Sequence, residues 1–199
     1  MIRRGIFGGT FDPPHIGHIM LAQIAYETLH LDLVEFVPAG EPPHKEASQI
    51  SPASFRVALV EAAIATFPYF HVSLREIERE GLSYTVDTIK ALHKEFPQDQ
   101  LFFFVGGDML HDLPNWRDPD EIFRLAHLVI APRPNVDCEK GMDSLRSLYP
   151  HAQMTLLEMP KLDIASRWIK ERLRNHQYVE PLLMPKVSSL IAQKGWYQS

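Results

Sequence analysis

The sequence predicts an α/β protein built around a doubly wound parallel sheet of about six strands, with helices on both faces. Short apolar runs of strand length alternate along the chain with segments of helical periodicity, which is typical of parallel sheets. The length of 199 residues fits one sizeable domain. We therefore expect a single domain over residues 1–199, with C-terminal helices from about residue 163 onward packed on the sheet.

The expected elements can be placed in chain order. Residues 3–7 form a short apolar strand that ends at two glycines, and a mostly apolar helical face recurs through 16–29. Residues 101–105 are the most apolar run, as in a central strand buried on both faces. The charged stretch 76–80 is expected at a solvated edge and 135–150 as a surface excursion. The other strands are expected at 33–37, 70–74, 127–131 and 154–158, and the other helices at 53–66, 86–95, 120–125, 163–174 and 185–194.

Composition narrows the class of protein. Twenty basic and 25 acidic residues give a net charge of −5, which argues against non-specific nucleic-acid binding but leaves room for a local basic pocket. The single cysteine, Cys138, excludes an internal disulfide. No apolar run approaches the ~20 residues of a membrane helix, and the chain starts directly in a strand pattern. We expect a cytoplasmic protein without nucleic-acid or membrane partners; a homo-oligomer is left open.

The stretch 6–18 carries the strongest chemical signal. It reads Ile-Phe-Gly-Gly-Thr-Phe-Asp-Pro-Pro-His-Ile-Gly-His, a strand followed by a glycine turn and the start of a helix near His15. Gly8 and Gly9 lack Cβ atoms, so the backbone can turn tightly and approach a ligand closely. The free amides of this turn, together with the helix dipole, predict a cradle for an anion such as phosphate.

Two histidines stand at this predicted helix start. His15 and His18 are three residues apart and therefore share one face, and Gly17 between them is expected to leave room for a ligand. Two imidazoles beside a phosphate cradle suit the charge that develops during phosphoryl transfer. The pair could also bind zinc, but no third ligand is obvious nearby, so we expect no metal site built by the protein alone.

The decapeptide Gly-Thr-Phe-Asp-Pro-Pro-His-Ile-Gly-His resembles the signature of the nucleotidylyltransferase superfamily, which transfers nucleoside monophosphates from ATP or CTP. Later motifs narrow the resemblance to bacterial nicotinate mononucleotide adenylyltransferases, over nearly the whole chain. The resemblance implies transfer of AMP from ATP to nicotinate mononucleotide, with Mg²⁺ carried by ATP. It places His15 and His18 on the ATP phosphates, with the loop amides of Gly8, Gly9 and Thr10.

A second motif is expected to bind the acceptor. Ser83-Tyr84-Thr85 opens the helix expected at 86–95, and by itself it predicts an ordinary Ser/Thr helix cap. In the resembled family the Ser-Tyr-Thr-x-x-Thr motif lines the nicotinate site. Trp116 follows the Gly-x-Asp motif at the family's distance; a lone tryptophan is usually core, but a flat indole in polar surroundings can stack on the ring.

Two cations follow strand ends. Lys45 lies in Pro-Pro-His-Lys, a loop that alone would be a solvated turn, whereas in the family this lysine helps bind substrate phosphate. Arg133 follows the strand expected at 127–131 and is expected to be a further anion ligand on the nicotinate mononucleotide side. The family has Arg-Pro-Gly here; Asn135 replaces the glycine and is expected to keep a left-handed turn.

Two further segments are expected to bind ATP. Gly106-Gly107-Asp108 resembles the nucleotide-ribose loop of Rossmann-like folds, in which a carboxylate accepts from ribose hydroxyls, so Gly106 and Asp108 are assigned to ATP. The family's phosphate-binding segment Ile-Ser-Ser-Thr-x-Ile-Arg reads Ile-Ala-Ser-Arg-Trp-Ile-Lys over 164–170, so three positions depart from the pattern. Ser166 keeps a hydroxyl, and Lys170 with Arg167 is expected to replace the missing arginine.

Two other functions compete with this interpretation. Phosphopantetheine adenylyltransferase shares the first motif, but as a family it is shorter and lacks the Ser-Tyr-Thr and Gly-x-Asp…Trp features. A non-catalytic nucleotide sensor could keep the cradle, and the three departures over 164–170 give this reading some weight. A tRNA synthetase is disfavoured, because 199 residues leave no room for a tRNA-binding domain.

Overall fold

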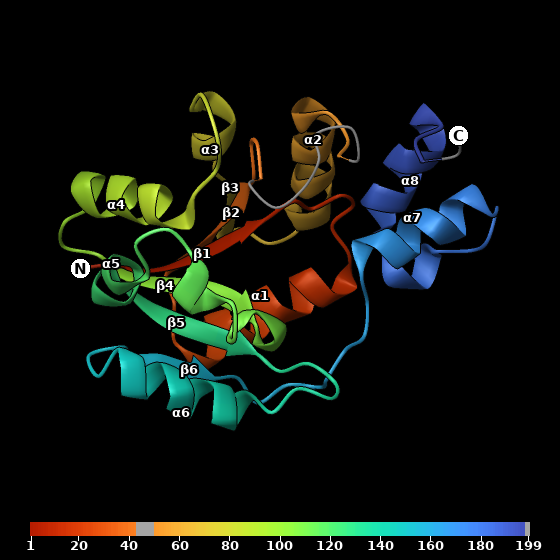
Figure 1. Cartoon of the computed structure of the whole chain (residues 1–199). Helices are drawn as coiled ribbons and strands as arrows, with labels where there is room; N and C mark the ends of the chain where they lie inside the picture. The colour runs from red at the N-terminus through yellow and green to blue at the C-terminus, as the bar shows by residue number, and fades with distance from the viewer. Residues whose placement is uncertain (43–49, 198–199) are drawn as a thin grey trace.

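A computed structural model of the chain describes residues 1–42 and 50–197. At its centre is a six-stranded sheet in the order β3-β2-β1-β4-β5-β6 (Figure 1). Every described strand pair is parallel. The chain builds outward from β1 on one side and then returns to β4 on the other, which is the doubly wound order. The strands are β1 (Arg3–Gly9), β2 (Leu33–Pro38), β3 (Phe70–Val72), β4 (Gln100–Gly106), β5 (Ala126–Ala131) and β6 (Met154–Leu156).

Helices cover both faces of this sheet, as the sequence predicts. One hydrophobic cluster joins one face to α1 (Ile16–Thr28), α2 (Ala53–Ile64), α7 (Ser166–Arg174) and α8 (Pro185–Lys194). A second cluster joins the other face to α4 (Thr85–Glu95), α5 (Pro119–Leu125) and α6 (Cys138–Leu148). The short α3 (Arg75–Glu78) lies between β3 and α4. Figure 1 shows α7 and α8 side by side next to α2, with the two termini on opposite sides.

Neighbouring residues of the central strands are buried on opposite faces. Phe7 and Phe104 belong to the first cluster, whereas Ile6 and Val105 belong to the second. Successive side chains of a strand point to opposite faces of the sheet. Because both faces are covered, neither set meets water, and the strands are apolar throughout instead of alternating.

Two sequence-based expectations are wrong. The segment 135–150 contains the 11-residue helix α6, whose buried Cys138, Met142 and Leu145 recur at helical spacing. Its polar residues outnumber this narrow apolar stripe, which explains why the composition suggested a surface excursion. The charged stretch 76–80 is not wholly solvated, because Glu76 is only 7% exposed.

Several local expectations are confirmed. Asn135 adopts a φ of 59°, the left-handed turn expected where the family has glycine. Gly195 ends α8 with a φ of 65°.

Helix α7 begins at Ser166, three residues later than expected. The longest described helix, α1, has 13 residues, and none of the described helices is long and apolar enough to span a bilayer.

Candidate active site

Strand β1 runs two residues further than expected, so Gly8 and Gly9 are its last residues and pair with β2. The chain from Gly8 to Asp12, which we call the glycine loop, turns on a buried aromatic ring. Phe11 is 2% exposed and has a φ of 50°, a conformation that L residues rarely adopt. A Cβ on Gly9 would lie 3.0 Å from the Phe11 ring, so glycine at this position lets the ring pack closely against the backbone. The Phe11 ring packs edge-on against Phe7 and His18, with centroids 5.4 and 5.1 Å away. The buried Phe11 ring therefore supports the loop, and Gly8, Gly9 and Thr10 line the cavity described below.

The predicted histidine pair stands at the start of α1. His15 is the extended N-cap residue, and its backbone N–H donates to Nδ1 of His18 at 3.1 Å. The two imidazole rings stack with centroids 3.7 Å apart. Because Nδ1 of His18 accepts a hydrogen bond, its neutral ring carries the proton on Nε2. The structure thus makes Nε2 of His18 a hydrogen-bond donor.

The two histidines differ in burial and charge. His15 is 4% exposed, and burial, assisted by the charge of Arg133, lowers the pKa of His15 to about 3. His15 is therefore neutral at physiological pH. A Cβ on Gly17 would lie 3.1 Å from Nδ1 of His15, so this glycine makes room for the imidazole of His15. The room that it is expected to leave for a ligand stays a prediction.

The loop after β4 lies on the neighbouring side of the site. A Cβ on Gly107 would come within 2.4 Å of Sγ of the buried Cys138, so this position favours glycine. A Cβ on Gly106 would come within 2.3 Å of Oδ1 of Asp108 and would displace that exposed carboxylate. Asp108 is exposed, with Oδ1 3.6 Å from Nε of Arg133. Arg133 also donates to the carbonyl of Leu162 at 3.1 Å. These contacts place Arg133 on the histidine side; its assignment to nicotinate mononucleotide stays a prediction.

The start of α7 abuts the loop that follows β1. The hydroxyl of Ser166 donates to the carbonyl of Pro13 at 2.8 Å, and Nζ of Lys170 donates to Oδ2 of Asp12 at 2.8 Å. Arg167 is exposed on the same helix. No side chain caps the helix at Ala165, so the first backbone N–H groups of α7 stay available to an anion.

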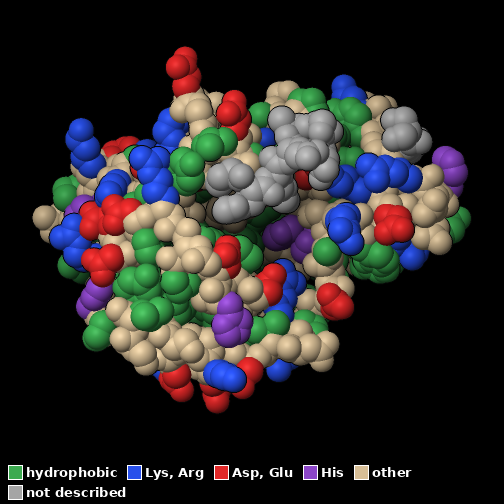
Figure 2. Space-filling model, in the orientation of Figure 1, with side chains coloured by type: hydrophobic (Ala, Val, Ile, Leu, Met, Phe, Trp, Pro, Cys, Tyr) green, Lys and Arg blue, Asp and Glu red, His purple; other side chains and the backbone are tan. Residues whose placement is uncertain are grey.

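A cavity of about 600 Å³ opens at the carboxyl ends of the central strands. Gly8, Gly9 and Thr10 line one wall, and the expected acceptor residues Ser83, Tyr84, Thr85 and Trp116 line another, so the structure brings two distant motifs together. Figure 2 shows histidine side chains in a hollow near the middle of this face, over the start of α1 in Figure 1. Lys45 lies outside the described residues.

Hydrogen bonds and a cation–π contact fix the residues that line the acceptor side of the cavity. Oγ of Ser83 accepts from the amide N–H of Gly40 at 3.0 Å, which ties the loop after β2 to the start of α4. The half-buried Trp116 donates its indole N–H to Asp112 at 3.3 Å. The guanidinium of Arg117 lies 4.7 Å from the ring centre of Tyr84. Ser83 thus helps to build the wall, and Trp116 presents an anchored indole.

One carboxyl group in the cavity wall was missed from the sequence. Glu76 lines the cavity and accepts a hydrogen bond from Oγ1 of Thr88 at 2.6 Å. Burial raises the pKa of Glu76, while the hydroxyls of Thr88 and Ser83 oppose this shift. The only signal in the sequence is Thr88, three residues after Thr85 and so on the same helical face, and it does not reveal its partner.

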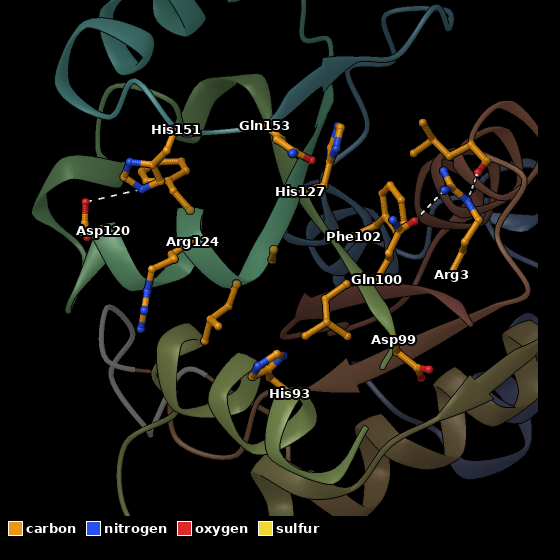
Figure 3. A pocket seen from close by; sticks show the side chains of 15 residues that line it. Arg3, His93, Asp99, Gln100, Phe102, Asp120, Arg124, His127, His151 and Gln153 are labelled. Carbon is orange, nitrogen blue, oxygen red and sulfur yellow. Dashed lines mark hydrogen bonds and ion pairs between the residues drawn. The ribbon is translucent and has the colours of Figure 1, made fainter. Parts of the chain in front are cut away.

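A larger hollow of about 820 Å³ lies at the opposite, amino ends of β1, β4 and β5. Figure 3 shows two pairs among its polar groups: Arg3 donates to Gln100 at 2.7 Å, and His151 lies 3.5 Å from Asp120. Ligands of open α/β sheets bind at the carboxyl ends of the strands, near the point where the strand order reverses. The cavity beside β1 and β4 is therefore the candidate site.

The chain is similar to known proteins over almost its whole length. The family model described as cytidylyltransferase-like matches residues 6–189. A probable nicotinate-nucleotide adenylyltransferase of Halalkalibacterium halodurans is 40% identical over 200 residues, covering 100% of this chain and 93% of the relative. Its counterpart from Geobacillus thermodenitrificans is 39% identical over 193 residues, with 97% and 85% coverage.

A solved structure shares the fold. The Plasmodium falciparum nicotinic acid mononucleotide adenylyltransferase complexed with NaAD superposes with a TM-score of 0.79 at 19% identity, covering 99% of this chain and 98% of that one. At this identity the match supports the fold alone, whereas the family model and the relatives cover almost the whole sequence. The chain belongs to the cytidylyltransferase-like family, among the relatives named nicotinate-nucleotide adenylyltransferases.

Proposed function

We propose that the protein transfers AMP from ATP to nicotinate mononucleotide, giving deamido-NAD and pyrophosphate, with Mg²⁺ entering on the nucleotide. The observation that carries this proposal is the single cavity that joins the glycine loop to the start of α4. One end is lined by the backbone of Gly8, Gly9 and Thr10, and the chain runs from there to His18 at the start of α1. The other end offers the start of α4 and an indole to a flat, acidic ring. The relatives' names point to the same reaction.

The reaction needs positioning and charge stabilisation rather than a protein nucleophile. An oxygen of the acceptor's own phosphate attacks the α-phosphorus of ATP, a new P–O bond forms, and the bond to the β-phosphate breaks so that pyrophosphate leaves. Nε2–H of His18 and the amides of the loop from Gly8 to Thr10 donate to the phosphate oxygens on which charge develops. Asp108 and the start of α7 complete the ATP side of this proposal, and Arg133 remains an anion ligand on the nicotinate mononucleotide side.

The start of α4 is suited to the acid form of the acceptor. Tyr84 is the N-cap, no side chain caps the helix, and the amides at Thr85 and Val86 precede the first intrahelical bonds. A carboxylate only accepts hydrogen bonds, so it matches these donors and the positive end of the helix dipole. A carboxylate beside the ring could instead accept from the NH₂ group of a carboxamide acceptor, and Asp108 and Asp112 are the two candidates. Asp112 already accepts from the indole N–H of Trp116, and Asp108 lies near Arg133.

Steady-state assays of pyrophosphate release test the proposal with ATP and three acceptors: nicotinate mononucleotide, nicotinamide mononucleotide and phosphopantetheine. A carboxamide would turn its NH₂ toward a helix-start donor, and a mispaired buried donor costs roughly 1–3 kcal/mol. We therefore expect kcat/KM for the acid to exceed that for the amide by about 10- to 100-fold. Equal values would show that this helix start does not read the carboxylate.

The same assay separates the competing functions. Turnover of phosphopantetheine in place of the nucleotides would identify the other adenylyltransferase. ATP binding without turnover of any acceptor would identify a nucleotide sensor. A protein of normal stability that does neither would contradict the assignment of the glycine loop to ATP.

A further inference from the structure

A buried carboxylate connects three distant parts of the chain beneath the glycine loop. Asp12 is 4% exposed. Its Oδ2 accepts from Nζ of Lys170 at 2.8 Å and from the backbone N–H of Ser51 at 3.2 Å, and its Oδ1 accepts from the hydroxyl of Tyr197 at 2.6 Å. The loop after β1, the start of α2, helix α7 and the C-terminal end thus meet at one side chain.

A buried guanidinium lies beside this carboxylate and fixes the same loops. Arg56 is 1% exposed and donates to the carbonyls of Ser51 and Thr10, each at 3.0 Å, and to that of Gly40 at 3.4 Å. Thr10 lines the cavity, and Gly40 lies between the lining residues Ala39 and Pro42. We refer to Asp12, Arg56, Lys170 and Tyr197 as the Asp12 cluster; its two cations and one carboxylate leave one positive charge under the phosphate cradle.

Packing and hydrogen bonding hold different parts of Tyr197. The chain leaves α8 through the left-handed turn at Gly195, and the ring of Tyr197 packs against Phe55 of α2, with centroids 5.3 Å apart. Figure 1 shows this C-terminal end next to α2. Burial and the charge of Asp12 raise the pKa of Tyr197, so its hydroxyl keeps its proton and donates to Asp12. Loss of the hydroxyl alone would leave the ring packing in place.

We propose that Tyr197 is a positioning residue for adenylyl transfer, whose hydroxyl latches the C-terminal end of the chain onto Asp12 and so sets the loop and Lys170 for the triphosphate. Asp12 lies between Phe11, on which the ring of His18 packs, and Pro13, whose carbonyl holds Ser166 at the start of α7. A shift of Asp12 therefore moves both sides of the phosphate cradle. This inference rests on the proposed ATP site and not on the identity of the acceptor.

The test is Tyr197→Phe in the full chain, compared with Tyr69→Phe. Tyr69 is a matched control, because it is also half-buried and donates its hydroxyl to one carboxamide, Oε1 of Gln23, at 2.8 Å. A hydrogen bond to a charged group is among the stronger ones in a protein. For Tyr197→Phe we expect the Kd of a non-hydrolysable ATP analogue, measured by calorimetry without acceptor, and the KM for ATP to rise roughly 3- to 30-fold.

The KM values for the two substrates distinguish a positioning role of Tyr197 from a general loss of stability. The KM for nicotinate mononucleotide should stay within about twofold, and Tyr69→Phe should leave both KM values unchanged. An ATP Kd within twofold of wild type, or equal changes in both KM values, would overturn the proposal. Because analogue binding needs no acceptor, it also reports on the latch if the proposed acceptor is wrong.

A double-mutant cycle tests whether the hydroxyl acts through the carboxylate. On an Asp12→Ala background, Tyr197→Phe should change the Kd of the ATP analogue by less than twofold, because its partner is already absent. Losses that add fully in the double variant would show that Tyr197 acts through another contact and would contradict the latch. If Asp12→Ala does not fold, the substrate split of Tyr197→Phe decides the question by itself.

Discussion

Replacement of His18 by asparagine separates its two contacts at the start of α1. Nδ1 of His18 accepts from the backbone N–H of His15 at 3.1 Å, which satisfies one donor of the helix start. The side-chain oxygen of asparagine can occupy nearly the position of Nδ1, but the residue has no group in the position of Nε2. His18→Asn therefore keeps the cap and removes the proposed donor, whereas His18→Ala removes both.

The expected magnitudes follow from these contacts. Loss of one donor to a developing oxyanion costs roughly 2.7–4 kcal/mol, or about 10²–10³ in kcat. Both variants should show this loss in single-turnover and steady-state pyrophosphate release, with a much smaller change in the Kd of an ATP analogue. Only His18→Ala should also lose stability, because it loses the cap, worth about 0.5–2 kcal/mol, and its ring packing on Phe11.

The reasoning fails if His18→Asn turns over at a near-normal rate. That result would mean that Nε2–H does not stabilise the transition state and that the ring serves as a helix cap alone. A rise in the ATP KM with kcat unchanged would instead assign His18 to uniform binding of the nucleotide.

Two further predictions concern His15 and α7. The pKa of His15 is about 3 in the folded protein and 6.5 in the unfolded chain, so only the unfolded chain binds a proton here as the pH falls through 6.5. The free energy of unfolding should therefore be lower by about 2 kcal/mol at pH 5 than at neutral pH. His15→Ala should lack this contribution in denaturant unfolding, and an unchanged pH dependence in this variant would contradict the prediction. Lys170→Ala should destabilise the fold by roughly 1–3 kcal/mol, since Asp12 loses its ion pair, whereas exposed Arg167→Ala should not. The double variant should raise the KM for ATP more than either single one; if all three leave it unchanged, the phosphates are held elsewhere.

The sequence was sufficient to predict the elements that depend on local chemistry. The alternation of apolar runs and helical periodicity predicted the parallel sheet that the structure has. The glycines before an apolar helix predicted an anion cradle at the end of the first strand. These signals are local because strand burial, turn conformation and helix starts depend on residues within a few positions of each other. The left-handed turn at Asn135 belongs to the same class.

Tertiary packing decided which charged side chains are buried and what they contact. The sequence predicts that Glu76 is solvated with its charged neighbours, whereas the fold buries it in the cavity wall, where it accepts a hydrogen bond from Thr88. Lys170 is predicted from the sequence to bind phosphate, and only the fold shows that its ammonium also pairs with Asp12, 158 residues earlier in the chain. A polar residue is buried only where distant segments supply its partners, and no local pattern encodes those partners. The motif therefore predicted where the site lies, whereas only the packing of α2, α7 and the C-terminal end showed how its loop is held in place.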